Sequence, residues 1–429
     1  MSTFFGPRKR SEQNNLLTVD SPEGQRHGPS SQQMLRILAT QIFLNSLGRG
    51  VFLALTVLYF TLIVGLSVAE IAAILTVSSA LGVATSWLGG SLADRFSAKR
   101  LLLALLVVEG LALLSYAFAS SFMVALVIAC VVTGASSCSK AVRATIVGRA
   151  FEGEVRIRTR AILLTVGNVG IALGGAAASI PLMMNTPEAY RLTIGIAGFA
   201  TLISAARIVA LPGRVDAIVL SKLDRAASAH LVGRSPWRDP RYLGLAALSA
   251  VFGLQFGLAE IGIPLWVLHH TEAPVVVVSI ALIVNTVLVV ALQIPLSRGS
   301  HDIRRAGKAV SLAGVFMAVA CAVYAASAGV SPVLALTLIL VAAVAHSFGE
   351  ILSSAGIWGL SYELADPRSA GAYQGLFAMA FSIGTMVTPA VIAATVVDNG
   401  TAGWVVLGAI FLASSAGIRA IAHRAPSSA

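Results

Sequence analysis

Five ionisable residues interrupt long apolar stretches of this sequence: Arg49, Glu109, Glu260, His346 and Glu350. A carboxylate or an imidazole can take up and release a proton, and a guanidinium can pair with a carboxylate or with an anionic ligand. If the apolar stretches span a membrane, each charge costs about 2.5–3.5 kcal/mol at the bilayer centre, so it needs a partner or a water-filled cavity. These residues are therefore candidates for proton exchange and ligand binding.

The first two candidates each allow two interpretations. Arg49 lies between Gly48 and Gly50, near the middle of its apolar stretch. It could contact a substrate or act as the counter-ion of a proton-carrying carboxylate, and the alternative is a structural pair between two helices. Glu109 is central in its own stretch. It could exchange a proton, and the alternative is a buried structural partner.

The other three candidates lie in the second half of the chain. Glu260 follows Gln255 by about one helical turn and could be a binding or proton site, or a solvated gate residue. His346 and Glu350 are four residues apart, which places them on one face of a helix. They could form a proton relay or contact a substrate, and the alternative is a structural polar pair. A metal site would need more ligands than these two.

Two uncharged polar residues inside apolar stretches, Asn168 and Asn285, are further candidates for binding. Amides often hydrogen-bond across neighbouring helices, so packing is the alternative for both. Lys140, Arg143 and Arg207 lie toward the ends of their stretches. Their long side chains can extend to the membrane surface, so we expect no specific role for them.

The composition indicates a chain that lies in lipid. Apolar residues make up 57% of the 429 positions and charged residues only 11%. A soluble domain carries about 25% charged residues, which it needs to cover its surface. The net charge of +11 does not indicate a nucleic-acid partner, because Lys and Arg occur in short segments between the apolar stretches.

The sequence contains no motif that indicates disulfides, a metal cluster, nucleotide binding or an enzyme site. The three cysteines all fall inside apolar stretches, which predicts neither disulfides nor a metal cluster: Cys130, Cys138 and Cys321. A phosphate-binding loop is absent from the sequence, since the Gly307-Lys308 pair is followed by Ala309. No nucleophile, base and oxyanion donor combine into an enzyme site, so we expect no enzymatic activity and no cofactor.

Twelve stretches are long enough to cross a bilayer as helices of about 20 residues. They are 36–62, 69–91, 101–119, 122–145, 161–184, 191–211, 242–267, 275–296, 308–329, 332–356, 371–396 and 401–421. Because the apolar stretches are unbroken and do not alternate, a β-barrel is not expected. The sequence predicts an all-α integral membrane protein with twelve transmembrane helices.

The distribution of Lys and Arg predicts the orientation. With a cytoplasmic N-terminus, all 30 of these residues except Arg49, Arg191 and Arg207 fall on cytoplasmic segments or adjoining helix ends. Positive residues stay on the cytoplasmic side of a membrane, and an even number of helices returns the chain to that side. We therefore expect both termini in the cytoplasm.

The chain divides into two halves of six helices. We expect a disordered cytoplasmic tail at 1–34, helical halves at 35–211 and 242–421, and a C-terminal tail at 422–429. The charged connection 212–241 separates the halves. Each half has a charged turn after its second helix, in which Asp94 or Asp302 precedes a cation by six positions. Related six-helix halves are typical of duplicated transporters.

The turn after the second helix resembles the signature of the major facilitator superfamily, Gly-x-x-x-Asp-Arg-x-Gly-x-Arg/Lys-Arg/Lys. The matching residues are Gly90, Asp94, Arg95, Lys99 and Arg100. Ser97 stands where the second Gly is usual, which would weaken a tight turn. Gly90 would permit close helix packing, Asp94 would accept hydrogen bonds or pair with a cation, and the basic residues would hold the loop at the membrane surface. We interpret this segment as a conformational latch.

The resemblance implies the major facilitator fold over 36–421. In that family, helices 1, 4, 7 and 10 surround the central cavity, which favours a role in that cavity for Glu260 in helix 7. The third helix of each set lies outside the cavity, so Glu109 in helix 3 is equally consistent with a structural partner.

A glycine cluster in the fifth stretch is similar to the Gly-Pro-x-x-Gly-Gly element of the drug/proton antiporter branch of that family. The shared residues are Gly170, Gly174 and Gly175, while Ile171 replaces the Pro and Val166 replaces the leading Gly. Small residues let helix backbones approach closely, so ordinary helix packing is the alternative interpretation.

These features together predict a secondary transporter that exports small amphipathic organic compounds, coupled to protons, by alternating access. One alternative is proton-coupled uptake of a metabolite such as a sugar or an organic acid. Another is a membrane sensor or scaffold that transports nothing. We expect a monomer in the plasma membrane that is powered by the proton gradient, and whose partners are its organic substrate, protons and lipid.

Overall fold

The computed structural model describes residues 31–184, 186–212 and 234–425, and every regular element in these ranges is helical. Most of the expected tail (1–30), most of the expected linker (213–233) and 426–429 lie outside the described residues. The N-terminal half consists of α1 (Ser31–Tyr59), α2 (Val68–Arg95), α3 (Ala98–Ser115), α4 (Phe122–Ala150), α5 (Gly153–Ala177), the short α6 (Ser179–Met184) and α7 (Pro187–Ile208). The C-terminal half consists of α9 (Pro240–Val251), α10 (Leu254–Gly257), α11 (Ile263–His270), α12 (Val276–Leu296), α13 (Ile303–Ala326), α14 (Pro332–Glu363), α15 (Ala370–Ile392) and α16 (Asp398–Arg424).

These elements form twelve rods in the described ranges, since α5 and α6 together make one rod, as do α9, α10 and α11. By length and apolar composition alone, ten helical stretches of the described chain could cross a membrane. One of the ten, Pro367–Arg424, contains both α15 and α16. The remaining rod, α3, carries Lys99, Arg100 and Glu109 within its 18 residues, which explains why composition alone does not select it. The twelve-helix prediction is confirmed.

Several helices extend beyond the apolar stretches that predict them. The fifth begins at Gly153 and not near 161, and the tenth continues to Glu363 and not to 356. The seventh is interrupted by a π-helical segment, Leu258–Gly262. A helix keeps its own backbone hydrogen bonds after it leaves the hydrocarbon, so polarity does not mark its end.

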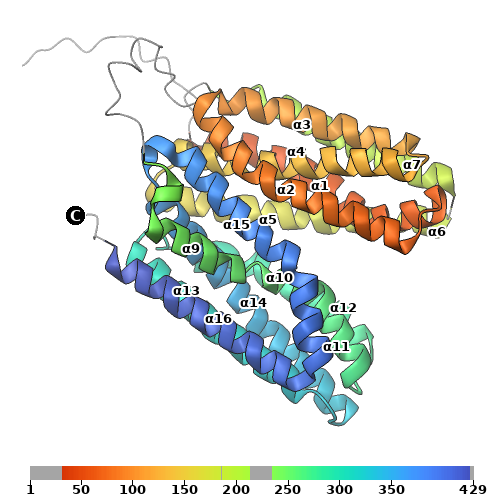
Figure 1. Ribbon diagram of the computed structural model, residues 1–429, viewed down its shortest axis with the longest axis vertical. Coiled ribbons are helices and arrows are strands. Elements are labelled where there is room, and N and C mark those ends of the chain that lie inside the picture. Colours follow the sequence, from red (N-terminus) through yellow and green to blue (C-terminus); the bar gives the residue numbers. More distant parts are fainter. Residues whose placement is uncertain (1–30, 185, 213–233, 426–429) are drawn as a thin grey trace, which may run out of the picture.

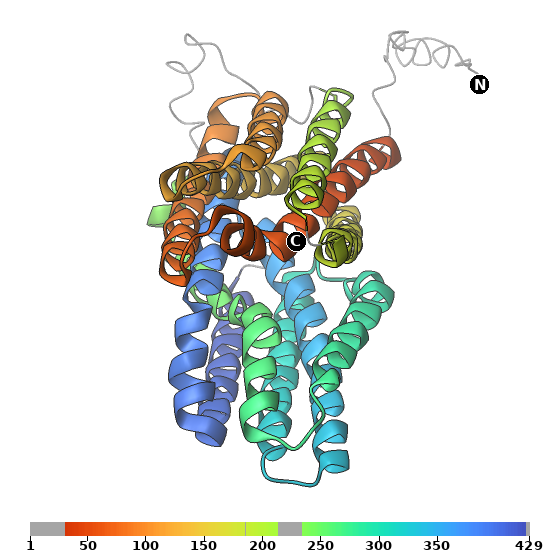
Figure 2. The ribbon, with the colours of Figure 1, turned by 90° about the vertical axis from the view of Figure 1, so that its right-hand side faces the viewer.

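The two halves lie side by side and diverge from one another (Figure 1). Figure 2 shows the N-terminal half above and the C-terminal half below. The helix α15 packs along α2 and also contacts α4, while α12 packs against α5. We use the term basic end for the end of the bundle formed by the connections α2–α3, α4–α5, α12–α13 and α14–α15. These connections and the adjoining helix ends carry most of the basic residues of the described helices.

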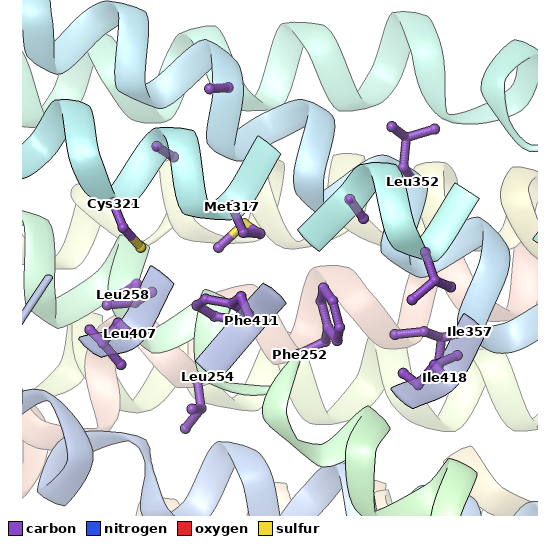
Figure 3. Packing of buried hydrophobic residues seen from close by; sticks show 14 of the residues in the cluster. Phe252, Leu254, Leu258, Met317, Cys321, Leu352, Ile357, Leu407, Phe411 and Ile418 are labelled. Atoms are coloured by element: carbon purple, nitrogen blue, oxygen red, sulfur yellow. The ribbon is translucent and has the colours of Figure 1, made fainter. Parts of the chain in front are cut away.

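Each half has an apolar core of its own. Figure 3 shows part of the C-terminal core, in which the rings of Phe252 and Phe411 lie 5.5 Å apart beside Met317. Trp266 is fully buried and donates a hydrogen bond of 2.8 Å to the backbone oxygen of Tyr324. The N-terminal half packs around two apolar clusters, one of which also includes Tyr362 of α14, so the halves can change their relative position with little unpacking of either core.

Candidate functional site

A carboxylate at the basic end joins the two halves. Asp94, in the last turn of α2, accepts hydrogen bonds from the backbone N–H groups of Gly371 (2.8 Å) and Ala372 (2.7 Å) in the first turn of α15. The guanidinium of Arg149, at the end of α4, lies 2.5 Å from the same carboxylate. The first N–H groups of a helix lack partners within the helix and carry partial positive charge, so they favour an anion.

One helical turn before Asp94, Gly90 lets the backbones of α2 and α15 come into contact. A Cβ atom added at Gly90 would lie 2.0 Å from the backbone oxygen of Gly371 and 2.5 Å from the Cα atom of Gly375. A Cβ added at Gly371 would in turn lie 2.3 Å from the backbone oxygen of Gly90. No side chain fits between these backbones, so the contact requires glycine at both positions.

The basic residues of the signature have different surroundings. The Lys99 ammonium donates hydrogen bonds to the backbone oxygens of Val209 (2.8 Å) and Leu211 (2.5 Å), which ties the start of α3 to the residues after α7. Arg95 and Arg100 are exposed at the basic end. Of the three cations, Lys99 therefore holds the loop within its own half.

The turn between α2 and α3 does not require glycine. Ser97 has φ −61° and ψ 113°, an ordinary extended conformation, and its hydroxyl accepts a hydrogen bond of 3.1 Å from the N–H of Arg100. Ser97 thus caps α3, and the expected weakening of a tight turn does not apply. In the second half, Asp302 caps α13 by accepting from the N–H of Arg305 (2.7 Å). The two similar turns therefore differ, since Asp94 reaches across the halves and Asp302 caps its own helix.

A second contact between the halves lies beside the first. Arg156, in the first turn of α5, donates a hydrogen bond of 2.6 Å to Glu363 at the end of α14, and its guanidinium lies 5.3 Å from the ring centre of Tyr362. One turn further along α5, the guanidinium of Arg160 lies 3.9 Å from the ring centre of Trp358. Cation–π contacts at such distances are attractive.

Deeper between the halves, Arg49 and Glu260 attract one another. Arg49 is half-buried near the middle of α1, and Glu260 is exposed in the π-helical segment Leu258–Gly262. Short π-helical segments occur frequently at functional sites. Among the described residues, neither side chain has an ion pair within 4.0 Å. The attraction therefore acts over more than 4.0 Å and depends on the charge of Glu260.

Glu109 is only 3% exposed and lies against α1. Its Oε1 accepts a long hydrogen bond of 3.4 Å from the Asn45 side chain, and its Oε2 has no hydrogen-bond partner among the described residues. Three cations attract this carboxylate: Arg143, Lys140 and Arg49. Its surroundings fit the structural partner that we gave as the alternative.

Lys140 and Arg143, for which the sequence suggests no specific role, interact with two of the candidate residues. Both lie on α4, three residues apart, and their charges interact with Arg49 on α1 and Glu109 on α3. Their charges therefore act on Arg49 and Glu109 of the neighbouring helices. Arg160 on α5 interacts with Arg143. The sequence does contain an indication that they act together. Lys140 and Arg143 are three residues apart within one predicted transmembrane helix, which places both on the same helix face.

We use the term cation cluster for these four residues: Arg49, Lys140, Arg143 and Arg160. Lys140 is exposed and the other three are half-buried. Among the described residues, none of the four has an ion pair within 4.0 Å. Because an isolated charge in the membrane costs about 2.5–3.5 kcal/mol, the cluster indicates a site that admits water or a ligand.

The structure separates His346 from Glu350. Glu350 Oε2 accepts a hydrogen bond of 2.9 Å from Asn285 on α12, and Asn285 also donates to Ser347 (3.1 Å). His346 is 4% exposed and lies beside the backbone of Gln255. The two side chains thus contact different helices, α12 and the α9–α11 rod. In the described part of the chain, no three His, Cys, Asp or Glu residues gather as metal ligands.

The glycines of α5 lie against α1. A Cβ at Gly174 would lie 2.1 Å from the backbone oxygen of Leu47, and one at Gly170 would lie 2.8 Å from the Cβ of Ser46. At Gly175 a Cβ would meet nothing within 4 Å. Asn168 on the same helix is half-buried. Close packing therefore requires glycine at Gly170 and Gly174, and not at Gly175.

Solved structures with the same arrangement are membrane transporters. The human organic anion transporter MFSD10 (TETRAN) is 15% identical with a TM-score of 0.68, over 91% of this chain and 100% of that chain. The major facilitator superfamily transporter FucP, in the outward conformation, is 12% identical with a TM-score of 0.66, over 93% and 100%. A bacterial homologue of the iron transporter ferroportin, in an outward-facing state, is 11% identical with a TM-score of 0.69, over 91% and 98%. At these identities the likeness shows the fold alone.

The family follows from the sequence itself. No curated protein matches this chain. The family model of the Major Facilitator Superfamily matches residues 38–389, which include the α2–α3 turn, the cation cluster and the chain from α1 to nearly the end of α15. The twelve helices, the cross-half contact of Asp94 and this match lead to one conclusion: the chain is a membrane-embedded secondary transporter that belongs to the Major Facilitator Superfamily.

Proposed function

We propose that this chain exports small amphipathic organic compounds in exchange for protons by alternating access. The observation that carries the proposal is the contact of Asp94 with the first turn of α15, which holds the two halves together at one end. Charged residues from both halves, Arg49 and Glu260, attract one another deeper in the molecule. A latch at one end and a charged site between the halves suit a transporter whose halves rock around the site.

The orientation of the transporter is part of this proposal. The basic end carries most of the basic residues of the described helices, and the positive-inside rule assigns such an end to the cytoplasm. The conformation held by Asp94 is then closed to the cytoplasm. We infer a monomer in the plasma membrane with both termini in the cytoplasm.

Glu260 is the residue that we assign to proton coupling. When its carboxylate is ionised, it attracts Arg49 of the other half. When a proton neutralises it, this attraction disappears and the halves separate more easily. Glu350, held by Asn285, is a second carboxylate that could exchange a proton. The proton gradient supplies the energy, and no cofactor is required.

The proposal is tested in cells that lack their own efflux pumps. We expect expression of the chain to reduce the accumulation of some members of a panel of small amphipathic compounds, and a protonophore to abolish this effect. Glu260→Gln should reduce the response to the proton gradient, whereas Arg207→Gln, an exposed position on α7, should not. Higher accumulation inside the cells would indicate uptake and contradict export. Unchanged accumulation of every compound would contradict transport of this class.

A further inference from the structure

The cation cluster contains more positive charge than its surroundings compensate. Lys140 and Arg143 lie three residues apart on α4; Arg49 on α1 interacts electrostatically with both, and Arg160 on α5 with Arg143. Helix residues three apart are neighbours on one face. The positive charges of Lys140, Arg49 and Arg143 repel one another, and Arg143 also repels Arg160. Such an arrangement is unfavourable unless negative charge is supplied.

The protein supplies only part of that negative charge. Glu109 attracts three members of the cluster, and Glu260 attracts Arg49. Three of the four cations therefore share these two carboxylates, and neither carboxylate attracts Arg160. The Nε atoms of Arg143 and Arg160 are buried and have no hydrogen-bond partner among the described residues. Two guanidinium donors inside the protein thus lack an acceptor, which a bound anion would provide.

An aromatic surface of the other half lies beside Arg160. Trp358 on α14 contacts the guanidinium of Arg160 at 3.9 Å, and its ring centre lies 6.4 Å from that of Phe381 on α15. Phe381 in turn lies 6.1 Å from Phe256, which precedes Glu260 by four residues. These aromatic rings are only partly covered by protein, since Phe256 is 37% exposed and the other two are half-buried.

We propose that the cation cluster binds the negative group of the transported compound and that Trp358, Phe381 and Phe256 contact its apolar body, so that the substrate is a small organic anion such as an aromatic carboxylate. This inference deepens the proposed transport function and rests on it. The carboxylate would accept hydrogen bonds from the guanidinium groups of Arg143 and Arg160. The aromatic rings distinguish such a compound from an inorganic anion, which has no apolar surface to bury.

The inference is tested by thermal unfolding of the full chain in detergent with three probes of nearly equal shape: 2-naphthoate, 2-naphthamide and 2-naphthamidine. Ligands that bind the folded protein raise its unfolding temperature in a concentration-dependent manner. We expect 2-naphthoate to raise it, the neutral amide and the cationic amidine to have little effect, and sulfate to require far higher concentrations. A shift by the amide or the amidine equal to that by naphthoate would overturn the inference.

Variants of Lys140 then locate the binding site. We expect Lys140→Met to weaken naphthoate binding about tenfold, because it removes one of the positive charges that attract the carboxylate. Lys140→Arg should keep most of the affinity, and Arg207→Gln, which removes a charge outside the cluster, should keep all of it. Without ligand, Lys140→Met should unfold at the same or a higher temperature, since it relieves repulsion. A lower unfolding temperature together with unchanged naphthoate affinity would show a purely structural lysine and overturn the inference.

A second variant covers the case in which Lys140→Met does not fold. Arg160→Gln removes one unpaired donor from the other end of the cluster, and we expect a similar loss of naphthoate affinity. The two proposals can also fail separately. Transport of neutral or cationic compounds without naphthoate binding would overturn the anion site and leave transport standing. Naphthoate binding that depends on Lys140, without flux of any compound, would support the anion site and contradict the transport function.

Discussion

The Asp94 carboxylate and the backbone N–H of Gly371 are 277 residues apart in the sequence and 2.8 Å apart in space. Asp94 lies in the last turn of α2 and Gly371 in the first turn of α15, so this hydrogen bond joins the C-terminal end of one helix to the N-terminal end of another. Such a bond exists only while the basic end is closed. Its strength therefore contributes to the balance between the closed and open arrangements of the halves.

Asp94→Asn should weaken the closed arrangement. The amide keeps an acceptor oxygen but loses the negative charge that the α15 N-terminus and Arg149 favour. A hydrogen bond to a charged group contributes about 1.5–3 kcal/mol, so we expect transport to fall roughly tenfold or more. Spin labels at the exposed positions Arg95 and Arg368 should show longer distances in the variant.

Asp302→Asn is the matched control for that prediction, because Asp302 caps α13 in the related turn of the other half. Asparagine is also a good capping residue, so the variant should keep its transport rate and unfolding temperature. An equal loss of transport in both variants would show that the charge of the turn matters, and not the contact with α15.

Gly90→Ala should prevent the closed arrangement at the basic end. The new Cβ would lie 2.0 Å from the backbone oxygen of Gly371, and neither backbone can move without separating α2 from α15. Overpacking of this kind costs about 1–3 kcal/mol. Gly175→Ala is the control, because nothing lies within 4 Å of its Cβ position and alanine favours a helix. We expect transport assays in proteoliposomes to show a large loss for the first variant and none for the second.

Reversing the charge of Arg156 should open the second contact between the halves. Arg156→Glu places two carboxylates where a 2.6 Å hydrogen bond joins Arg156 to Glu363. The double variant Arg156→Glu/Glu363→Arg should restore much of the transport rate. In it, the glutamate lies in the first turn of α5 and the arginine at the last residue of α14, which are the favourable ends of the helix dipoles. A double variant no better than the single variant would show that the pair does not act as a unit.

Glu109 and Glu260 both attract Arg49, but we expect Glu109 to contribute to stability and Glu260 to proton coupling. Glu109→Gln should lower the free energy of unfolding by about 1.5–3 kcal/mol, because it removes a buried charge from among three cations. Glu260 is exposed, so Glu260→Gln should change stability by less than about 0.5 kcal/mol. It should instead make transport insensitive to an imposed pH gradient, since a glutamine cannot be protonated. Thermal unfolding and flux measured at several pH values would separate the two effects.

The sequence was sufficient for the membrane class, the twelve helices and the family signature, because these depend on local properties. An apolar stretch of about 20 residues is a span wherever it packs. The Gly90–Arg100 spacing is likewise read along the chain. Helix ends were less certain: the fifth helix begins at Gly153, among basic residues that the apolar criterion excludes.

Only the tertiary structure decided which candidates meet. It placed Lys140 and Arg143, which the sequence argument set aside, beside Arg49 and Glu109, and it joined Glu350 to Asn285 and not to His346. It also placed Asp94 on α15 while Asp302 caps its own helix. Electrostatic and hydrogen-bond partners come from different helices, so they depend on how the helices rotate and pack. Hydrophobicity along the chain specifies that a helix spans the membrane, whereas its neighbours and its rotation are set by packing against the other helices.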